Sequence, residues 1–125
     1  MAARGGSVVN VASISASRGA FFMAQNAHGA AKGGVLGLTY QLVVEGGPHG
    51  IRVNAVSPAM TQTPHTTPLL ADSGGPAASI AARTPLGRWG QPDDVANAIL
   101  FLCCDESSHV SGANIPVDGG AAAVG

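Results

Sequence analysis

The sequence predicts an α/β fold built on a parallel sheet, and three observations lead to this prediction. Residues 7–12, 51–57 and 114–117 are short apolar runs of the length expected for buried strands. Residues 26–45 and 92–104 are longer segments with helix start and stop signals. Strands and helices therefore alternate along the chain, an order that gives a parallel sheet with right-handed crossover connections.

The first strand, at 7–12, is rich in Val and lies between Gly5-Gly6 and a group of serines. A loop from 13 to 25 follows, which is Ser-rich at first and then apolar. Asn26 is a suitable N-cap for the next helix, and Gly46-Gly47-Pro48 stops that helix.

The helix at 26–45 contains four glycines, at positions 29, 33, 34 and 37. A glycine inside a helix costs about 1 kcal/mol relative to Ala. Four glycines are expected where another backbone packs closely against the helix. The alternative is a weak, frayed helix.

Pro58 ends the second strand, because Pro cannot donate to a sheet ladder. Residues 59–84 are rich in Thr, Pro, Ala, Ser and Gly, and we expect them to form a mobile lid with one short helix near 77–82. Residues 85–91 are expected to form a structured turn.

The second helix begins at Pro92, which suits the first helical position, and Asp93 and Asp94 complement the helix dipole in its first turn. It is expected to end near Cys104. Its packing stripe is expected to consist of Val95, Ile99, Leu102 and Cys103.

The composition indicates a single domain whose apolar surface is covered by another subunit or by another part of the fold. The 125 residues suffice for a single domain, 46% are apolar and only 10% are charged. Average chains have about 25% charged residues. Another subunit or another part of the fold is therefore expected to cover apolar surface. The net charge of −1 and the lack of a Lys/Arg cluster argue against nucleic-acid binding.

Membrane, export and metal signals are weak. The longest apolar stretches are shorter than a membrane span, and residues 1–6 lack the apolar core of a signal peptide. Cys103 and Cys104 are adjacent and show no metal-binding spacing, so we expect reduced thiols packed on a helix in a cytoplasmic protein. The isolated loop histidines are expected to be solvated; they are His49, His65 and His109.

Polar residues converge on one edge of the predicted sheet. Ligands of parallel sheets bind beyond the carboxyl ends of the strands. Ser13 follows the first strand, residues 58–63 follow the second, and the first helix begins nearby. His28 and Lys32 lie one turn apart on that helix. These residues predict a reaction site at the carboxyl edge.

In this order, the motifs resemble the C-terminal half of the short-chain dehydrogenase/reductase family. The matching segments span essentially the whole chain; they are Gly6 to Ser13, His28-Gly29-Ala30-Ala31-Lys32, Gly50 to Pro58, Pro58 to Thr63, Pro85 to Arg88, and Val117-Asp118-Gly119-Gly120. The resemblance implies an incomplete Rossmann-type, doubly wound parallel sheet, made of the last three strands with their connecting helices. Residues 1–125 would then form one partial NAD(P)-binding domain.

The resemblance also implies roles for residues. Ser13 corresponds to the catalytic serine, although the spacing to His28 leaves Ser15 as a second candidate. Lys32 aligns with the lysine of the family's Tyr-x-x-x-Lys motif, which activates the Tyr and binds the nicotinamide ribose. The remaining cofactor contacts implied by the resemblance are Pro58, Met60, Thr61 and Thr63.

Two departures from the family pattern affect the expected chemistry. The Gly-rich turn that holds the pyrophosphate of NAD or NADP is absent from the sequence. His28 occupies the position of the catalytic Tyr, and Tyr40 lies about 12 Å further along the helix, too far to replace it. The Lys32 cation disfavours a protonated imidazole, so His28 is expected to be a poor acid for carbonyl reduction. Ala59 replaces the expected Gly and would be strained at positive φ.

These observations predict a partial oxidoreductase that is inactive as this chain alone. In the family, hydride passes between NAD(P) and a small-molecule carbonyl or alcohol. The alternatives are activity with a separate N-terminal partner and His28 as base, or a non-catalytic association module. An open strand edge predicts a homo-oligomer, or pairing with a missing N-terminal half.

Overall fold

Residues 5–19, 25–71 and 74–124 are described in the structure, which is a computed structural model. Its strands are β1 (Gly6–Val11), β2 (Ile51–Pro58) and β3 (Asn114–Val117). They form a parallel sheet in the order β1-β2-β3. Its helices are α1 (Asn26–Gly46), α2 (Thr67–Leu70), α3 (Pro76–Arg83) and α4 (Pro92–Cys103). The predicted α/β fold with a parallel sheet is therefore confirmed.

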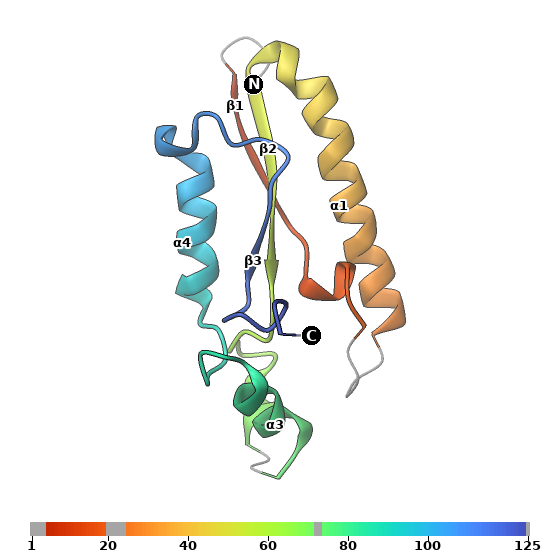
Figure 1. Cartoon of the computed structure of the whole chain (residues 1–125), viewed down its shortest axis with the longest axis vertical. Coiled ribbons are helices and arrows are strands. Elements are labelled where there is room, and N and C mark those ends of the chain that lie inside the picture. Colours follow the sequence, from red (N-terminus) through yellow and green to blue (C-terminus); the bar gives the residue numbers. More distant parts are fainter. Residues whose placement is uncertain (1–4, 20–24, 72–73, 125) are drawn as a thin grey trace.

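The two long helices cover opposite faces of the sheet (Figure 1). On β1, the Asn10 side chain donates to Thr39 of α1, whereas Ser7 donates to the Leu102 carbonyl of α4. These two residues are an odd number of positions apart, so their side chains point to opposite faces. The helix α3 lies beyond the carboxyl ends of the strands (Figure 1).

The two crossover connections have opposite hands. Strand order follows chain order, so both connections step across the sheet in the same direction. Because α1 and α4 lie on opposite faces, the connections cannot both be right-handed, and that expectation is wrong. Residues 59–113 connect β2 to β3. This connection is long enough for the chain to reach the other face of the sheet before α4 begins.

The core is centred on β2. Ala55 of β2 packs with Ala12 and Leu36 on the α1 side, while Leu102 of α4 is fully buried on the other side. Asn54 is also fully buried, and its amide donates to the Val110 carbonyl and accepts from the Ala113 N–H, at 2.8 and 3.0 Å. Each buried side-chain polar atom in the described residues has a partner.

The predicted boundaries of α1 need one correction. The helix includes Asn26, and Gln25 is the N-cap, without a side-chain hydrogen bond. The helix ends at Gly46, as the Gly-Gly-Pro signal predicted, and a 3-10 turn over Gly47–His49 follows.

The helical glycines divide into two groups. A Cβ at Gly29 would lie 3.0 Å from the Ser15 carbonyl oxygen, so the short 3-10 helix Ile14–Ala16 packs closely there. A Cβ placed at Gly34 or Gly37 would have no described atom within 4 Å, apart from the neighbouring residues and the local helix backbone. Close packing therefore explains only part of the glycine pattern.

The predicted lid and loop are only partly described. The segment 59–84 contains two short helices instead of one, α2 and α3. The loop predicted at 13–25 is described except for residues 20–24, and residues 1–4 also lie outside the described part.

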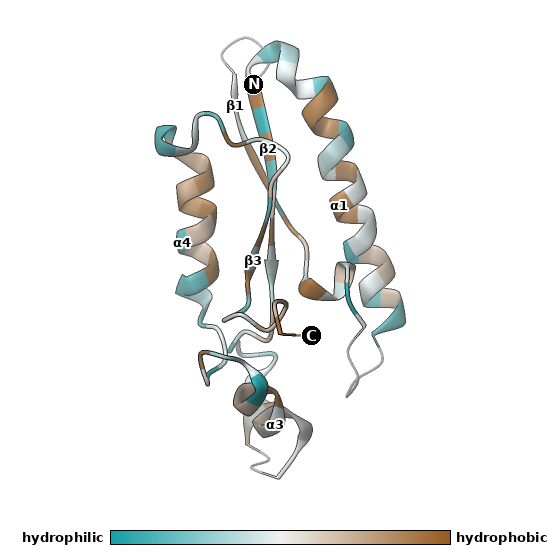
Figure 2. Ribbon diagram, in the orientation of Figure 1, coloured by the Kyte–Doolittle hydropathy of each residue, from teal (hydrophilic) through white to brown (hydrophobic). Residues whose placement is uncertain are grey.

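Some apolar side chains remain at the surface of the described residues. Cys103 is exposed, so its predicted place in the packing stripe is wrong, and both cysteines are free thiols. Apolar residues occur around much of α1 and α4 (Figure 2). No described helix is long and apolar enough to cross a bilayer.

Candidate functional site

The carboxyl end of β1 leads directly into the candidate site. The strand ends at Val11, and the Ala12 N–H still donates to the Val56 carbonyl of β2 at 2.8 Å. Ser13 follows as the N-cap of the 3-10 helix Ile14–Ala16. In Figure 1 the end of β1 lies beside the start of α1.

Lys32 reaches from α1 to this strand end. Its Nζ atom donates to the Val11 carbonyl oxygen at 2.8 Å. The ammonium group is thereby held two residues before Ser13 in the chain. The structure thus brings Lys32 to the carboxyl end of β1, where the sequence placed the site.

The hydroxyls of both candidate serines form hydrogen bonds within the chain. The Ser13 Oγ accepts from the Ser15 N–H at 3.2 Å, and the Ser15 Oγ donates to Gln25 Oε1 at 2.7 Å. Side-chain capping of this kind is common for Ser. These contacts do not distinguish Ser13 from Ser15. The role of Gln25 was not predicted, because a bond across residues 16–24 leaves no local sequence signal.

His28 lies in the first turn of α1 and is exposed. No hydrogen bond of its side chain occurs within the part of the chain that the structure describes. The other three histidines, at 49, 65 and 109, are also exposed, as predicted. No cluster of three or more His, Cys, Asp or Glu side chains that could hold a metal occurs in the described residues.

The segment after β2 is tied to β3 and to the turn before α4. The Ala59 N–H donates to the Val117 carbonyl at 3.2 Å, and the Gly90 N–H donates to the Met60 carbonyl at 3.0 Å. Thr61 forms a β-bridge with Gly90. No described non-glycine residue has positive φ, so Ala59 is free of the strain considered above.

Thr66 organises the threonines of this segment. Its hydroxyl donates to the Thr61 carbonyl at 2.6 Å and accepts from the Thr63 N–H at 2.8 Å. The hydroxyls of Thr63 and Thr66 lie 3.0 Å apart. The Thr61 hydroxyl donates to the Ala59 carbonyl at 3.1 Å. A ligand that used the Thr61 or Thr63 hydroxyl as a donor would replace one of these internal bonds.

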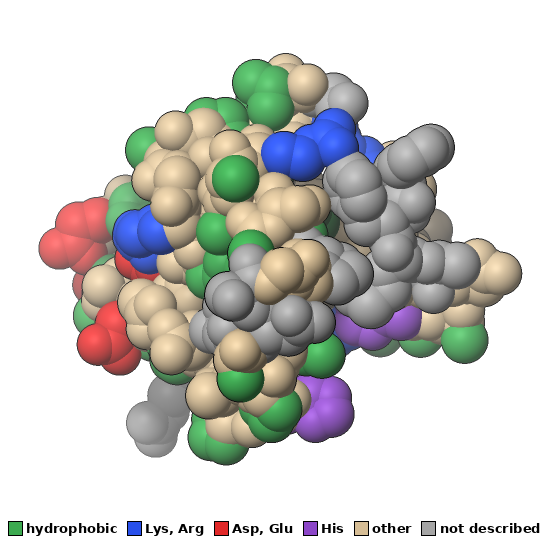
Figure 3. Space-filling view, turned by 90° about the horizontal axis from the view of Figure 1, so that it is seen from below, with side chains coloured by type: hydrophobic (Ala, Val, Ile, Leu, Met, Phe, Trp, Pro, Cys, Tyr) green, Lys and Arg blue, Asp and Glu red, His purple; other side chains and the backbone are tan. Residues whose placement is uncertain are grey.

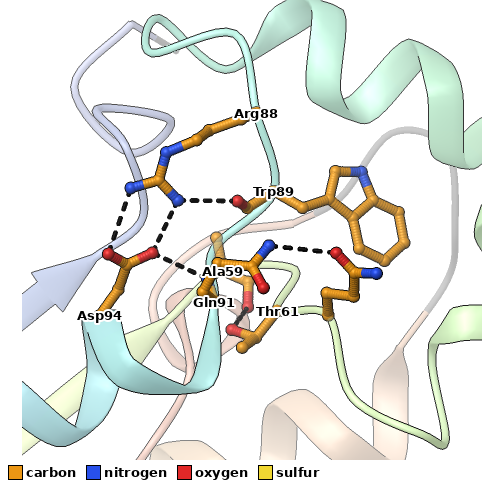
Figure 4. Close-up of polar contacts among 7 residues, drawn as sticks. Ala59, Thr61, Arg88, Trp89, Gln91 and Asp94 are labelled. Atoms are coloured by element: carbon orange, nitrogen blue, oxygen red, sulfur yellow. Dashed lines mark hydrogen bonds and ion pairs between the residues drawn. The ribbon is translucent and has the colours of Figure 1, made fainter.

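An ion pair fixes the turn that precedes α4 (Figure 4). Arg88 and Asp94 meet at 2.7 Å, and Arg88 also donates to the Trp89 carbonyl at 3.0 Å. The Gln91 N–H donates to Asp94 at 2.7 Å, completing a capping box at the start of α4. Gln91 in turn donates to the Gln62 side chain at 3.1 Å, which connects α4 to the segment after β2.

This ion pair changes the acidity of both partners. The hydrogen bond from Arg88, followed by that from the Gln91 N–H, lowers the pKa of Asp94 to about 2. Asp94 in turn raises the pKa of Arg88. From the sequence, Asp94 was expected only to complement the helix dipole. A Gln three residues before an Asp at the start of a helix is the signal that could have revealed the capping box.

A cavity of about 540 Å³ lies near the end of β3 and does not coincide with the predicted site. Arg88, Asp94 and Asp118 are its charged lining residues, and the other lining residues are Pro, Leu, Val and Gly. None of the predicted site residues lines it. Figure 3 views the molecule from the side where the strands end, and acidic and basic side chains lie next to each other at the left of this view.

The comparisons with known proteins agree on one family. A family model described as enoyl-(acyl carrier protein) reductase matches residues 1–122. A 3-oxoacyl-(acyl-carrier-protein) reductase of Thermotoga maritima is 44% identical over 117 residues, which are 94% of this chain and 46% of that protein. The cis-4-hydroxycyclohexanecarboxylate dehydrogenase of Sinomonas cyclohexanicum is 46% identical over 124 residues, which are 98% of this chain and 47% of that protein.

Solved structures show the same relationship. A provisionally named 2-deoxy-d-gluconate 3-dehydrogenase from Agrobacterium tumefaciens, crystallised with bound NADP, has a TM-score of 0.89 and 40% identity to this chain. The alignment covers 97% of this chain and 48% of that one. The chain thus spans about half the length of the relatives that it matches.

Proposed function

Because the chain belongs to the short-chain dehydrogenase/reductase family, we propose that it forms the carboxyl-terminal part of an NAD(P)-dependent oxidoreductase. In this proposal residues 1–125 are one partial Rossmann-type domain that does not catalyse hydride transfer alone. The observation that carries the proposal is the Lys32 ammonium at the Val11 carbonyl, two residues before Ser13. A cation and a hydroxyl at one strand end suit a nicotinamide ribose and a substrate oxygen.

The residues of this edge fit the nicotinamide end of NAD(P). Lys32 would bind the ribose hydroxyls, and Thr61 and Thr63 would meet the carboxamide, flanked by Pro58 and Met60 at the end of β2. The bound nicotinamide would donate or accept the hydride. Ser13, with Ser15 as the alternative, would hold the substrate oxygen.

The proton transfer is the weak part of this site. His28 stands where the family has Tyr, and its side chain is exposed. A neutral imidazole can accept the proton of an alcohol but is a poor donor to a carbonyl oxygen. We therefore propose that any activity in an assembled enzyme favours alcohol oxidation over carbonyl reduction.

The pyrophosphate end of the nucleotide has no counterpart in these 125 residues, because they contain no Gly-rich turn between a strand and a helix. We therefore propose that this chain alone binds neither NAD nor NADP. The relative crystallised with NADP is about twice as long as this chain. This supports the proposal that the pyrophosphate contacts come from a part of the fold outside these residues.

The test is a titration of the purified chain with NADH and NADPH, followed by calorimetry and by nucleotide fluorescence. We expect no saturable binding at millimolar nucleotide and no turnover on ketones. H28Y should not restore turnover by itself, because the pyrophosphate contacts are still lacking. Stoichiometric binding to either the original chain or H28Y would overturn the proposal.

A second candidate function is a non-catalytic association module, in the form of a homo-oligomer. The observation that favours it is the exposure of apolar side chains on α1, where Leu38, Tyr40 and Val44 are 52%, 50% and 72% exposed. Such a module would associate through α1 and would not need Lys32. K32A would then leave the oligomeric state unchanged in sedimentation experiments.

A further inference from the structure

The hydroxyl of Thr66 has a full set of hydrogen-bond partners within its own segment. A hydroxyl has one hydrogen to donate and two lone pairs that accept. The nearest acceptor is the Thr61 carbonyl oxygen, at 2.6 Å, and the hydrogen goes there. One lone pair accepts the Thr63 N–H, at 2.8 Å. The Thr63 hydroxyl oxygen lies 3.0 Å away, within reach of the second lone pair.

The Thr63 carbonyl does not compete for the Thr66 hydrogen. Its oxygen lies 3.2 Å from the Thr66 hydroxyl, further than the Thr61 oxygen. It already accepts from the Thr67 hydroxyl at 2.7 Å, and from the N–H groups of Thr66 and Thr67 at 3.0 and 2.8 Å. These donors occupy its two lone pairs. The Thr66 hydrogen is therefore assigned to the Thr61 carbonyl.

This assignment fixes the direction of the bond between the two hydroxyls. Because Thr66 gives its hydrogen to Thr61, Thr63 is the donor across the 3.0 Å contact. The Thr63 oxygen also accepts from the Thr66 N–H at 3.3 Å, which leaves it one lone pair. Toward a group outside the segment, the Thr63 hydroxyl can accept a hydrogen bond but has no hydrogen left to donate.

The Thr63 side chain lies where a ligand could reach it, and its position is fixed. Thr63 is only partly buried, beyond the carboxyl end of β2. The residues before it are tied to the turn that precedes α4, because the Gln62 N–H donates to the Gly90 carbonyl at 2.8 Å and the Gly90 N–H to the Met60 carbonyl at 3.0 Å. Thr66 holds the segment from the other side. An acceptor held in this way is arranged before any ligand binds.

We propose that Thr66 is a positioning residue that fixes the Thr63 hydroxyl as an acceptor, so that this position selects a ligand group with an N–H or O–H hydrogen. A carbonyl oxygen at the same place would face a lone pair. It could bind only if the Thr63 hydroxyl turned and gave up its bond to Thr66. Thr66 acts through Thr63 and does not need to touch the ligand.

The identity of the ligand rests on the proposed function, whereas the direction of the hydroxyl bond does not. If this edge holds a nicotinamide, the group at Thr63 is the amino group of the carboxamide, and the carboxamide oxygen is turned away. The two parts are therefore measured separately.

The direction of the bond is measured on this chain alone, by NMR with threonine labelled with carbon-13. A hydroxyl proton that is held in a hydrogen bond exchanges with water slowly enough to give its own signal at low temperature. We expect such signals from Thr63 and Thr66. A nuclear Overhauser contact should join the Thr63 hydroxyl proton to the Cβ proton of Thr66.

Substitutions at the two neighbouring threonines separate the hydroxyl bond from general packing. T66V removes the acceptor of the Thr63 hydroxyl, whose proton should then exchange about tenfold faster. T66S keeps the hydroxyl and should keep the slow exchange. T67V is the matched control, since it removes a hydroxyl that bonds the Thr63 carbonyl instead. Fluorescence of the buried Trp89 confirms that each variant is folded.

The selection is measured on this chain fused behind the amino-terminal half of the Thermotoga maritima reductase, a relative that is 44% identical to it. The probes are NADH and NADPH, each compared with its 3-acetylpyridine analogue, in which a methyl group replaces the amino group of the carboxamide. We expect the analogue to bind about tenfold more weakly, because it has no hydrogen to offer Thr63.

The ratio of the two dissociation constants is the decisive quantity. T66S and T67V should keep the tenfold preference. T66V frees the Thr63 hydrogen, which can then be donated to the carbonyl of either probe, so the preference should fall to about twofold. A general loosening of the segment would weaken both probes equally and leave the ratio unchanged.

Each outcome decides one part of the proposal. Slow exchange that is lost only in T66V, together with a preference that falls only in T66V, supports it. A Thr63 proton that exchanges as fast in the original chain as in T66V overturns the positioning role. Equal preferences in T66V and T66S overturn the selection. A fusion that binds no probe overturns the proposed function and the nicotinamide as ligand, while the exchange measurement still decides the role of Thr66.

Discussion

The two edges of the sheet differ in how they are protected. The edge of β3 is short and carries Pro116 at an outward position, so it lacks a donor there permanently. The edge of β1 has six residues, no Pro, and a single lysine that covers one carbonyl. The difference indicates that the β3 edge is less able than the β1 edge to pair with another strand.

The largest effect is expected from a pair of substitutions that test which backbone N–H groups of β1 face β2 and which face outward. V8P removes an N–H that faces β2, and we expect a loss of about 1–3 kcal/mol from the free energy of unfolding. V9P removes an N–H that faces outward and should cost clearly less. Urea denaturation of both variants, followed by Trp89 fluorescence, measures the difference. Equal losses would show that the two sides of β1 are not distinguished in this way.

An intermediate effect is expected from the opposite edge. P116V restores an outward N–H on β3 and should create a second edge able to pair. We expect a several-fold increase in the dimer fraction, which sedimentation velocity over a range of concentrations would reveal. P85V changes a Pro outside the strands and is the control. A P116V chain that associates no more than P85V would mean that Pro116 does not protect the β3 edge.

The smallest effect concerns the ion pair beside the β3 end. The pKa of Asp94 is lowered to about 2 in the folded chain, below its usual 3.8. A lowered carboxylate pKa stabilises the fold above the unfolded value, and this contribution is lost as the pH falls from about 4 toward 2. Because the pair is exposed, the contribution is small.

The measurement is a carbon-13 NMR titration of the Asp94 carboxyl, with R88M as the comparison. The midpoint should move up toward the usual Asp value when Arg88 is replaced. In thermal melts, the difference between the original chain and D94N should shrink below pH 4. An unchanged midpoint in R88M would assign the lowered pKa to the Gln91 N–H instead.

Much of the fold could be predicted because the signals are local. Pro58, Pro92 and the Gly46-Gly47-Pro48 run mark element ends by backbone chemistry, and the structure places boundaries at or beside them. The hand of the second crossover could not be predicted. Both faces of β2 are buried, so its apolar run does not indicate which face the next helix covers.

The candidate site was only partly predictable. The positions of Ser13 and Lys32 follow from their places after β1 and in α1. The contacts of Thr66 and Gln25 depend on how loops fold back, and side chains in a Thr-rich segment give no periodic pattern to read. The choice between Ser13 and Ser15 stays open, because both hydroxyls are engaged in local bonds.

The parallel arrangement of the strands also determines how the chain would respond to mechanical force. The β1 strand starts at one end of the sheet and β3 finishes at the other (Figure 1). A pull applied between the two termini would therefore slide neighbouring strands lengthwise. The hydrogen bonds of each strand pair would then share the load at the same time, instead of breaking one after another.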